Sequence, residues 1–522
     1  LKVARGAGSG ALAPCSGSGS LAPPRLPAEA GLTGRVSQQM EGRAASFERL
    51  LADFEVRVAG AEYVAIDAEL TGVDIEGEPD SFVETATDRL EKLCRVADRY
   101  TMMQLGITLV SKVKGADSQD NGSGQWACAS YNFYVFPWTG PELCGREPCF
   151  SCQCSSIQFN GKHNLDFNAW VNESVFYMSR EDEARFLASP ASSEDERLPE
   201  KVGMLRLWKV LCAARLPLIV HCPLDLFFVL AAFESRPLPG DDPKKLAQLS
   251  RQCFRVVYDT AYLHGRFRSF RRLGLTKFYE DARAKHTQLF EEGRGVAPVS
   301  FEFEQETASR YECGDELAHE AGYDSLVTAK LFIYLLAIAP AQVKSGANRL
   351  YLFKSTECID LDCAGANGTA GCSAFDANTT LLVAELETED DLQAARAISG
   401  GGAEYKWMGP SSLLVALRVS AGSDVQQRME ELAARVDGVS RWLPFSQWRA
   451  EARSQGAVAA VAPSPTPAAA PGASTGRSAA VAAKPGTAQR PHSLPRWLLA
   501  LLAPLLVQLW RLWRRQGQRR LH

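Results

Sequence analysis

Short apolar runs alternate with longer amphipathic segments between residues 47 and 336. Runs that favour β-structure predict strands at Tyr63–Ile66, Met102–Val110, Asn132–Phe136 and Leu216–Val220. Apolar residues at helical spacing predict helices at Phe47–Phe54, Val202–Ala213, Leu224–Phe233 and Ser325–Leu336. This alternation is typical of an α/β domain with a mixed sheet, which we place at residues 46–340.

A second pattern over residues 346–445 predicts a smaller α+β domain. Strands are expected at Thr380–Glu385, Glu404–Met408, Ser412–Val419 and Val439–Leu443, and helices at Glu389–Ile398 and Asp424–Val436. This order is that of a ferredoxin-like or RNA-recognition-motif-like fold. The aromatic stacking signature of an RNA reader is weak here, so a structural or dimerising variant is an equal alternative.

The two ends of the chain have compositions that do not build a core. Residues 1–45 are predicted to be a disordered extension, because the first forty are rich in Gly, Ala, Ser and Pro, with no acidic residue before Glu29. Residues 452–492 are rich in Ala, Pro and Ser and are expected to form a flexible linker.

The segment 496–513 is predicted to be a C-terminal membrane anchor. Its charge-free run from Trp497 to Trp510 has 14 residues, shorter than the roughly 20 of an ordinary span. Snorkelling of the flanking arginines, together with a thinned bilayer, lets a run of this length cross the membrane, and the tryptophans at its two ends suit the membrane interface. We therefore favour a spanning helix over one that lies flat. The alternative is a terminal helix docked on the protein body. We expect an intracellular protein on the endoplasmic reticulum or mitochondrial outer membrane, with its main domain facing the cytosol.

Charge is distributed unevenly along the chain. The net charge is −4, yet no acidic residue follows Glu451, while ten of the 57 basic residues do. The first 452 residues, with 47 basic and 61 acidic side chains, therefore carry about −14. Such an acidic body excludes a passive binder of nucleic acid held by charge alone. A nucleic-acid enzyme of this composition needs local basic patches or bound cations.

The 14 cysteines show no regular framework and are interpreted mostly as reduced thiols of an intracellular protein. The densest group comprises Cys144, Cys149, Cys152 and Cys154. A zinc site is conceivable there, but a second CxxC pair is missing, so buried or loop cysteines are favoured. The same interpretation applies to Cys358, Cys363 and Cys372.

Four carboxylates and one histidine form the candidate catalytic set. Asp67 and Glu69 follow the first apolar run, and residues i and i+2 of a strand point to one face. Two carboxylates so close need a cation between them. Asp225 follows the last strand, near the start of a helix. His319 precedes Asp324 by five residues, and a break at Gly322 is expected to let a loop histidine and a helical aspartate face one centre.

This set fits phosphodiester hydrolysis assisted by two metal ions. Oxygen ligands suit Mg²⁺ or Mn²⁺ rather than zinc. One ion activates water and the other stabilises the leaving oxygen, while His319 accepts a proton near neutral pH.

Five sequence blocks in this order resemble the poly(A)-specific ribonuclease branch of the DEDDh 3′→5′ exoribonucleases. They are Tyr63–Gly72, Gln104–Gly106, Tyr131–Pro137, Cys154–Phe159 with Leu165–Asn168, and His319–Asp324. The resemblance covers roughly residues 46–340. It implies a ribonuclease-H-like fold, two divalent ions, hydrolysis of single-stranded RNA from its 3′ end to 5′-mononucleotides, and a homodimer. By position, Asp67, Glu69, Asp225 and Asp324 are the metal ligands and His319 is the general base.

Two departures from the family pattern stand out. The second motif reads His221-Cys-Pro-Leu-Asp225, with Cys222 in place of the usual asparagine and one residue fewer. Residues 180–200 are too few for the extra nucleic-acid-binding domain of poly(A)-specific ribonuclease itself. The chain is therefore similar to the membrane-tailed trimmer subgroup, which shortens small-RNA 3′ ends. The expected substrates are poly(A) tails or small-RNA precursors.

A run of arginines beside two phenylalanines is a further candidate for RNA binding, with a solvated helix face as the equal alternative. It comprises Arg266, Arg268, Arg271 and Arg272. Asp259 ends another strand and is assigned a structural hydrogen bond. Two rival functions remain open: a deadenylase of the soluble type with an incidental tail, and an inactive nuclease that serves as an RNA-binding scaffold.

Overall fold

The computed structural model describes residues 41–113, 124–138, 149–188, 198–268, 274–296, 298–303, 311, 317–362, 371–375, 379–400, 403–418 and 425–461. The chain divides into two compact units, residues 1–460 and 461–522. The predicted anchor at 496–513 lies outside the described residues, as do residues 1–40 and most of the predicted linker.

The main sheet has eight strands, which run in the order β1-β4-β3-β2-β6-β7, with β5 and β8 paired to β4. They are β1 (Glu41–Gly42), β2 (Tyr63–Leu70), β3 (Met102–Lys112), β4 (Gly124–Pro137), β5 (Val175–Tyr177), β6 (Leu218–Val220), β7 (Val257–Asp259) and β8 (Val299–Phe303). Central β2 is antiparallel to β3 and parallel to β6. The predicted mixed α/β sheet is confirmed.

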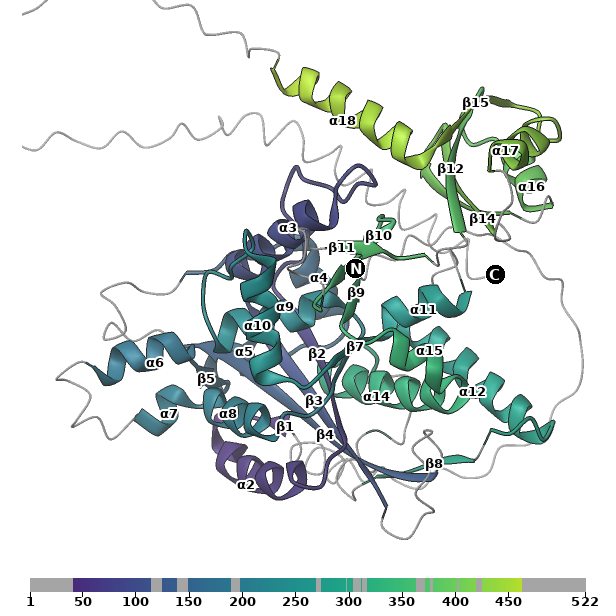
Figure 1. Cartoon of the computed structure of the whole chain (residues 1–522). Coiled ribbons are helices and arrows are strands. Elements are labelled where there is room, and N and C mark those ends of the chain that lie inside the picture. Colours follow the sequence, from purple (N-terminus) through teal and green to yellow (C-terminus); the bar gives the residue numbers. More distant parts are fainter. Residues whose placement is uncertain are drawn as a thin grey trace, which may run out of the picture. The chain divides into compact units, whose positions relative to one another are not determined.

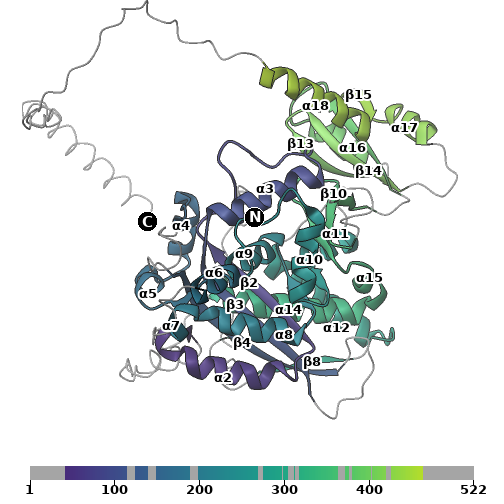
Figure 2. The same cartoon turned by 60° about the vertical axis from the view of Figure 1, so that its left-hand side comes forward.

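Helices cover both faces of this sheet (Figures 1 and 2). One layer contains α2 (Phe47–Val58), α3 (Ala86–Arg99), α8 (Met204–Ala214), α9 (Pro223–Phe233) and α10 (Pro243–Cys253). The other contains α11 (Thr260–Arg268), α12 (Leu275–Glu291), α14 (Ala321–Ile338) and α15 (Pro340–Ser345). The remaining short helices are η1 (Ala44–Ser46), α4 (Cys154–Lys162), α5 (Phe167–Asn172), α6 (Arg180–Leu187) and α7 (Leu198–Val202).

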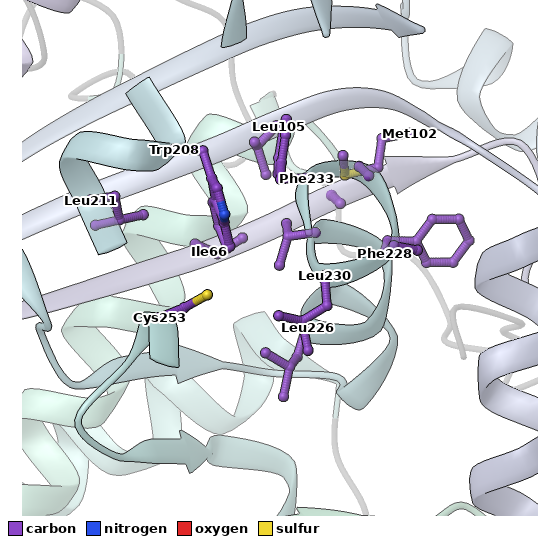
Figure 3. Close-up of a cluster of buried hydrophobic side chains, with 14 of the residues drawn as sticks. Ile66, Met102, Leu105, Trp208, Leu211, Leu226, Phe228, Leu230, Phe233 and Cys253 are labelled. Atoms are coloured by element: carbon purple, nitrogen blue, oxygen red, sulfur yellow. The ribbon is translucent and has the colours of Figure 1, made fainter. Parts of the chain in front are cut away.

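Alternation along β2 divides its side chains between two cores. Val64 and Ile66 belong to the core shared with α3, α8 and α9, whereas Ala65 belongs to the core of α14. Figure 3 shows part of the first core, where Ile66 and Trp208 lie close to the side chains of α9. Because Asp67 and Glu69 continue the Ala65 face, the strand presents them toward the α14 layer.

The second half of the unit contains two small sheets. One is β11-β10-β9, formed by β9 (Arg349–Tyr351), β10 (Glu357–Asp360) and β11 (Gly371–Ser373). The other is β13-β14-β12-β15, with β12 (Thr379–Leu386), α16 (Leu392–Gly400), β13 (Glu404–Gly409), β14 (Ser412–Arg418), α17 (Val425–Ala433) and β15 (Val439–Pro444) following in sequence. This is the expected order of strands and helices. Assignment to the RNA-recognition-motif fold stays a prediction.

Regular secondary structure extends further than expected at both ends of the described region. Residues 41–46 were predicted to belong mostly to a disordered extension, but β1 pairs in parallel with β4. Likewise α18 (Phe445–Val461) runs ten residues into the predicted linker. The reason is composition, since residues 449–461 are mostly Ala, Arg, Glu and Gln, which favour helix, and prolines begin only at Pro463.

Among the described residues, one helix is long and apolar enough to cross a membrane. It is α14, and 83% of its apolar window is buried inside the protein. Because most of it is buried, α14 is a core helix of the main domain.

Candidate active site at the end of strand β2

Asp67 and Glu69 lie within the last four residues of β2, because the strand continues to Leu70 rather than ending before them. Both are nearly buried, with exposed fractions of 5% and 3%. Opposite them on β3, Asp67 faces Gly106 and Glu69 faces Gln104. Two carboxylates two residues apart on one face repel each other in a site largely shielded from water.

The first turn of α14 sits directly on this part of the sheet. A Cβ atom added at Gly106 would lie 1.9 Å from the carbonyl oxygen of Ala321 and 2.5 Å from the amide nitrogen of Gly322. The absence of a side chain at Gly106 therefore lets the helix backbone approach β3 where β3 pairs with Asp67. The glycine of the Gln104–Gly106 block determines where Asp324 comes to lie.

Side chains from two strands cap the buried start of α14. The N-cap residue, Glu320, makes no side-chain cap hydrogen bond. Instead, the Ala321 amide donates to Gln104 Oε1 at 3.5 Å and the Gly322 amide donates to Asn132 Oδ1 at 3.2 Å. The first amides of a helix have no partner within it, so these contacts offset the cost of burying them. Sequence reasoning matched both blocks but missed this role.

His319, Asp324 and Glu69 come together at this place. Each offers one possible ligand atom, and these three atoms all lie within 4.8 Å of one another. His319 Nδ1 is 3.9 Å from Asp324 Oδ2, which is too long for a hydrogen bond. Asp324 is 4% exposed, whereas the His319 side chain is 29% exposed. The group thus has a buried carboxylate side and an accessible imidazole side.

The turn that presents His319 differs from the predicted glycine break. The helix already begins at Ala321, so Gly322 is helical and His319 precedes the helix as expected. The sharp bend falls at His319 itself, whose φ is +73°. Gly322 is needed for space, since an added Cβ would lie 2.4 Å from the Tyr311 hydroxyl and 2.8 Å from Asn132 Cβ. A non-glycine residue at positive φ is costly and is typical of functional sites.

Two aromatic rings, that of Phe159 in α4 and that of His163 at its C-cap, pack against His319, a role that the sequence did not reveal. The ring centroids of His163 and Phe159 lie 4.1 Å and 4.8 Å from that of His319, in edge-on arrangements. Helix α4 starts beside the end of β2, because the backbone amide of Gln153 donates to the Thr71 carbonyl oxygen at 2.7 Å. The Cys154–Phe159 block therefore supplies a support for the histidine. No motif in the sequence marked His163.

Asp225 is the third residue of α9, two residues after Pro223, and is 4% exposed. In the parallel pair of β2 and β6, Ala65 lies opposite Ile219. Strand β6 ends one residue later, so this register brings the start of α9 to the end of the sheet that carries Asp67 and Glu69. Asp67 and Asp225 are not members of the group within 4.8 Å. The shortened second motif thus still directs Asp225 to the expected end of the sheet.

The residues around Asp225 fix the start of α9. His221 Nδ1 lies 2.8 Å from the Thr260 hydroxyl, which donates to the Val220 carbonyl oxygen at 3.1 Å. Cys222 takes the N-cap position and makes no side-chain cap hydrogen bond. Burial, and then the neighbouring Asp225 carboxylate, raise the pKa of the Cys222 thiol. It therefore stays neutral beside the carboxylate.

Of Asp259 and the four arginines singled out in the sequence, only Asp259 has a described side chain. Asp259 accepts hydrogen bonds from the amides of Ala261, Tyr262 and Tyr351, which agrees with the structural role expected for it. Arg266 and Arg268 belong to the end of α11, but their side chains are outside what the structure describes, and so are Arg271 and Arg272 altogether.

Cys149 and Cys152 lie outside the helices and strands, which agrees with the loop alternative, and Cys154 begins α4. Cys149, Cys152 and Cys154 are all exposed. None of the three belongs to a group of metal-binding side chains in the described part of the chain. Cys144 lies outside the described residues.

Comparisons with known proteins identify relatives of this chain. The chain is 29% identical over 185 residues to poly(A)-specific ribonuclease PARN of Arabidopsis thaliana, and these residues cover 34% of this chain and 26% of that protein. It is 29% identical over 149 residues to poly(A)-specific ribonuclease PNLDC1 of Mus musculus, covering 28% and 26%. The match thus spans about a quarter of these relatives.

Among solved structures, Pop2p of S. pombe in its Mg²⁺- and Mn²⁺-bound form is similar at a TM-score of 0.37 and 14% identity, covering 60% of this chain and 98% of that one. A TM-score this low establishes no shared geometry. The sequence profile of the CAF1 family ribonucleases matches residues 43–195 and 188–332, more than half of the chain. This match contains all five predicted site residues, and the chain belongs to the CAF1 ribonuclease family.

Proposed function

We propose that this protein is a divalent-metal-dependent 3′→5′ exoribonuclease that hydrolyses single-stranded RNA 3′ ends to 5′-mononucleotides. The observation that carries the proposal is the group formed by Glu69, Asp324 and His319, whose ligand atoms lie within 4.8 Å. Membership of the CAF1 ribonuclease family and the names of the poly(A)-specific relatives support the same reaction.

The donor set fits Mg²⁺ or Mn²⁺. Asp67, Glu69, Asp225 and Asp324 offer carboxylate oxygens, the ligands that these hard cations prefer. All four are 3–5% exposed, so their negative charges are shielded from water and a bound cation would offset their repulsion. Two such ions would lower the pKa of the attacking water and stabilise the leaving 3′ oxygen.

His319 would accept the proton from the attacking water. Its imidazole is the least buried side chain of the group, at 29% exposed, so it is the member that solvent or RNA can approach. Phe159 and His163 hold the ring edge-on, and the bend at His319 fixes its backbone. A base held in one orientation loses less entropy when the reacting groups align.

The test uses the chain without residues 490–522, Mg²⁺ and two 5′-labelled RNAs, one ending in adenosines and one in mixed sequence. A ladder that shortens from the 3′ end, and that disappears with EDTA and in Asp67→Ala and Asp225→Ala variants, would support the proposal. Equal ladders on both RNAs would favour trimming of small-RNA precursors over deadenylation. RNA binding without a ladder in Mg²⁺ or Mn²⁺ would instead support the scaffold function.

We also propose that the segment 496–513 anchors the protein to an intracellular membrane with the nuclease facing the cytosol. Its tryptophan-bounded apolar run between arginines supports this. A chain without residues 490–522 should become soluble in a cell fractionation, and an unchanged distribution would contradict the anchor. The homodimer stays a prediction that light scattering of the soluble chain would test.

A further inference from the structure

A second cluster of metal-binding side chains lies away from the active site, among the helices on the opposite face of the sheet. It consists of Cys212, Glu234 and Cys253, and one ligand atom of each lies within 4.8 Å of the others. Cys253 is 1% exposed and Cys212 is 7% exposed, while the Glu234 side chain is 9% exposed. The ribonuclease proposal uses none of these residues.

Three helix ends converge to build this cluster. Cys212 lies in the last turn of α8, Glu234 is the C-cap residue of α9, and Cys253 is the last residue of α10. The C-terminal end of a helix carries a partial negative charge. Three such ends and a buried carboxylate therefore create a place that favours a cation.

The distances fit tetrahedral zinc. Cys253 Sγ lies 3.4 Å and Cys212 Sγ 4.0 Å from Glu234 Oε1. With ordinary Zn–S and Zn–O bond lengths and tetrahedral angles, a ligand sulfur and a ligand oxygen are separated by about 3.5 Å. The two observed separations bracket this value, so an ion would need only a small adjustment of the side chains.

Neighbouring groups hold the carboxylate in place. The Trp208 indole nitrogen donates to Glu234 Oε1 at 2.6 Å, and Arg180 Nε donates to the same oxygen at 2.9 Å. Figure 3 shows Trp208 and Cys253 reaching into the same part of the core from different helices. Both donate to the oxygen that lies nearest the two thiols, so zinc would take the place of one of these hydrogen bonds, and the other would orient the carboxylate.

Charge also balances when zinc is bound. Two thiolates and the Glu234 carboxylate supply three negative charges, which Zn²⁺ and the Arg180 guanidinium neutralise together. Binding therefore replaces the two thiol protons by Zn²⁺ and releases both protons to water. Thiolate ligands select zinc over Mg²⁺.

We propose that Cys212, Glu234 and Cys253 form a structural zinc site that ties together the C-terminal ends of α8, α9 and α10. A water molecule would be the fourth ligand of the ion. Glu234 follows Asp225 by nine residues along α9, which is about 13 Å of helix. The site would thus fix the far end of the helix whose start presents Asp225. This proposal does not depend on the ribonuclease activity.

Zinc retention by the full chain tests the site. The chain is stripped with a chelator, supplied with Zn²⁺, desalted and analysed by atomic emission. Cys212→Ser and Cys253→Ser should each retain about one equivalent less than wild type. The matched control Cys128→Ser, at a buried cysteine outside any group of metal-binding side chains among the described residues, should retain as much as wild type. Equal retention in all four proteins would overturn the proposal.

A measurement on wild type guards against variants that do not fold. X-ray absorption at the zinc edge should count two sulfur ligands at about 2.3 Å together with lighter atoms. Four sulfur ligands, no zinc uptake, or a Cys212–Cys253 disulfide in the reduced and zinc-treated chain would each contradict the site. Bound zinc should be lost on acidification, because protons compete for the thiolates.

Discussion

The candidate active site and the cluster of Cys212, Glu234 and Cys253 both bring metal-binding side chains together, but they offer different donor atoms. Glu69, Asp324 and His319 offer two oxygens and an imidazole at the end of a strand, with one side open to solvent. Cys212, Glu234 and Cys253 offer two sulfurs and one oxygen between helix ends, with the thiols buried. Donor chemistry therefore supports the two proposals, a hard, exchangeable cation at the first place and a softer, structural one at the second.

The difference teaches how a site's accessibility follows from its place in the fold. The strand β2 ends at Leu70, and beside this end the side chain of His319 is 29% exposed. Between α8, α9 and α10 the neighbours are core residues such as Trp208 and Leu211, which leave no room for a substrate. Substitutions should consequently affect catalysis at one site and stability at the other.

The largest expected effect is loss of activity on changing Asp324. Asp324→Asn keeps the size of the side chain but removes a metal-binding charge, and the rate should fall roughly 1,000-fold or more. The matched control is Glu234→Gln, which should leave the rate close to wild type while lowering the temperature of unfolding. Single-turnover cleavage of labelled RNA measures the rate. Comparable losses of activity in both variants would break the distinction between the sites.

The second expected effect is loss of the proposed base. His319→Ala should lower the rate by about two to four orders of magnitude, the usual contribution of general acid–base catalysis. His163→Ala removes only a ring that supports His319, and its loss should be smaller. The pH dependence of the rate separates the two, since only His319→Ala should lose a titrating limb. An identical pH profile in wild type and His319→Ala would show that a group other than His319 accepts the proton.

The same contrast explains how much could be predicted from the sequence. The active-site residues lie in short blocks whose pattern has a physical meaning, such as two carboxylates two residues apart on a strand. The cysteine site has no such block, because Cys212, Glu234 and Cys253 are 22 and 19 residues apart and meet only after three helices pack. A cluster of this kind is invisible until the helices are placed.

The spacing of apolar residues predicted which helices exist more accurately than it predicted where they begin and end. The helices expected at Phe47–Phe54 and Ser325–Leu336 exist, but they run from Phe47 to Val58 and from Ala321 to Ile338. The start of α14 was missed because its caps come from Gln104 and Asn132, far away in sequence. The break expected at Gly322 was wrong for the same reason, since close packing rather than a turn requires that glycine.

A third experiment tests the close approach that positions Asp324. Gly106→Ala forces a methyl group against the backbone of Ala321 and should destabilise the fold by about 1–3 kcal/mol, as overpacking usually does. Displacement of α14 should also lower the rate of RNA cleavage, because small misplacements at a catalytic centre are costly.

Gly265→Ala is the matched control for this substitution. It lies in helix α11, where an added Cβ meets nothing within 4 Å, so the change should be neutral or stabilising by up to about 1 kcal/mol. Urea unfolding measures both variants. Equal stability of Gly106→Ala and wild type would show that α14 is not held where we place it.

The smallest expected effect concerns a buried thiol that has no carboxylate beside it. Burial raises the pKa of Cys128 to about 12, so the folded protein keeps this thiol protonated where the unfolded chain ionises it. Stability from this group is fully present below the ordinary thiol pKa of about 8.5 and is lost as the pH rises toward 12. Raising the pH to 9.5 should therefore cost about 1 kcal/mol.

Cys128→Ala isolates this contribution, because every other titrating group is shared with wild type. The variant should be less stable at pH 7 through the cavity it creates, yet lose less stability between pH 8.5 and 9.5. Urea unfolding at each pH measures the difference, and parallel curves would contradict the raised pKa. Cys128 should also retain no zinc. A thiol that is merely buried keeps its proton, whereas the proposed site at Cys212 and Cys253 exchanges its protons for a cation because Glu234 and three helix ends favour positive charge there.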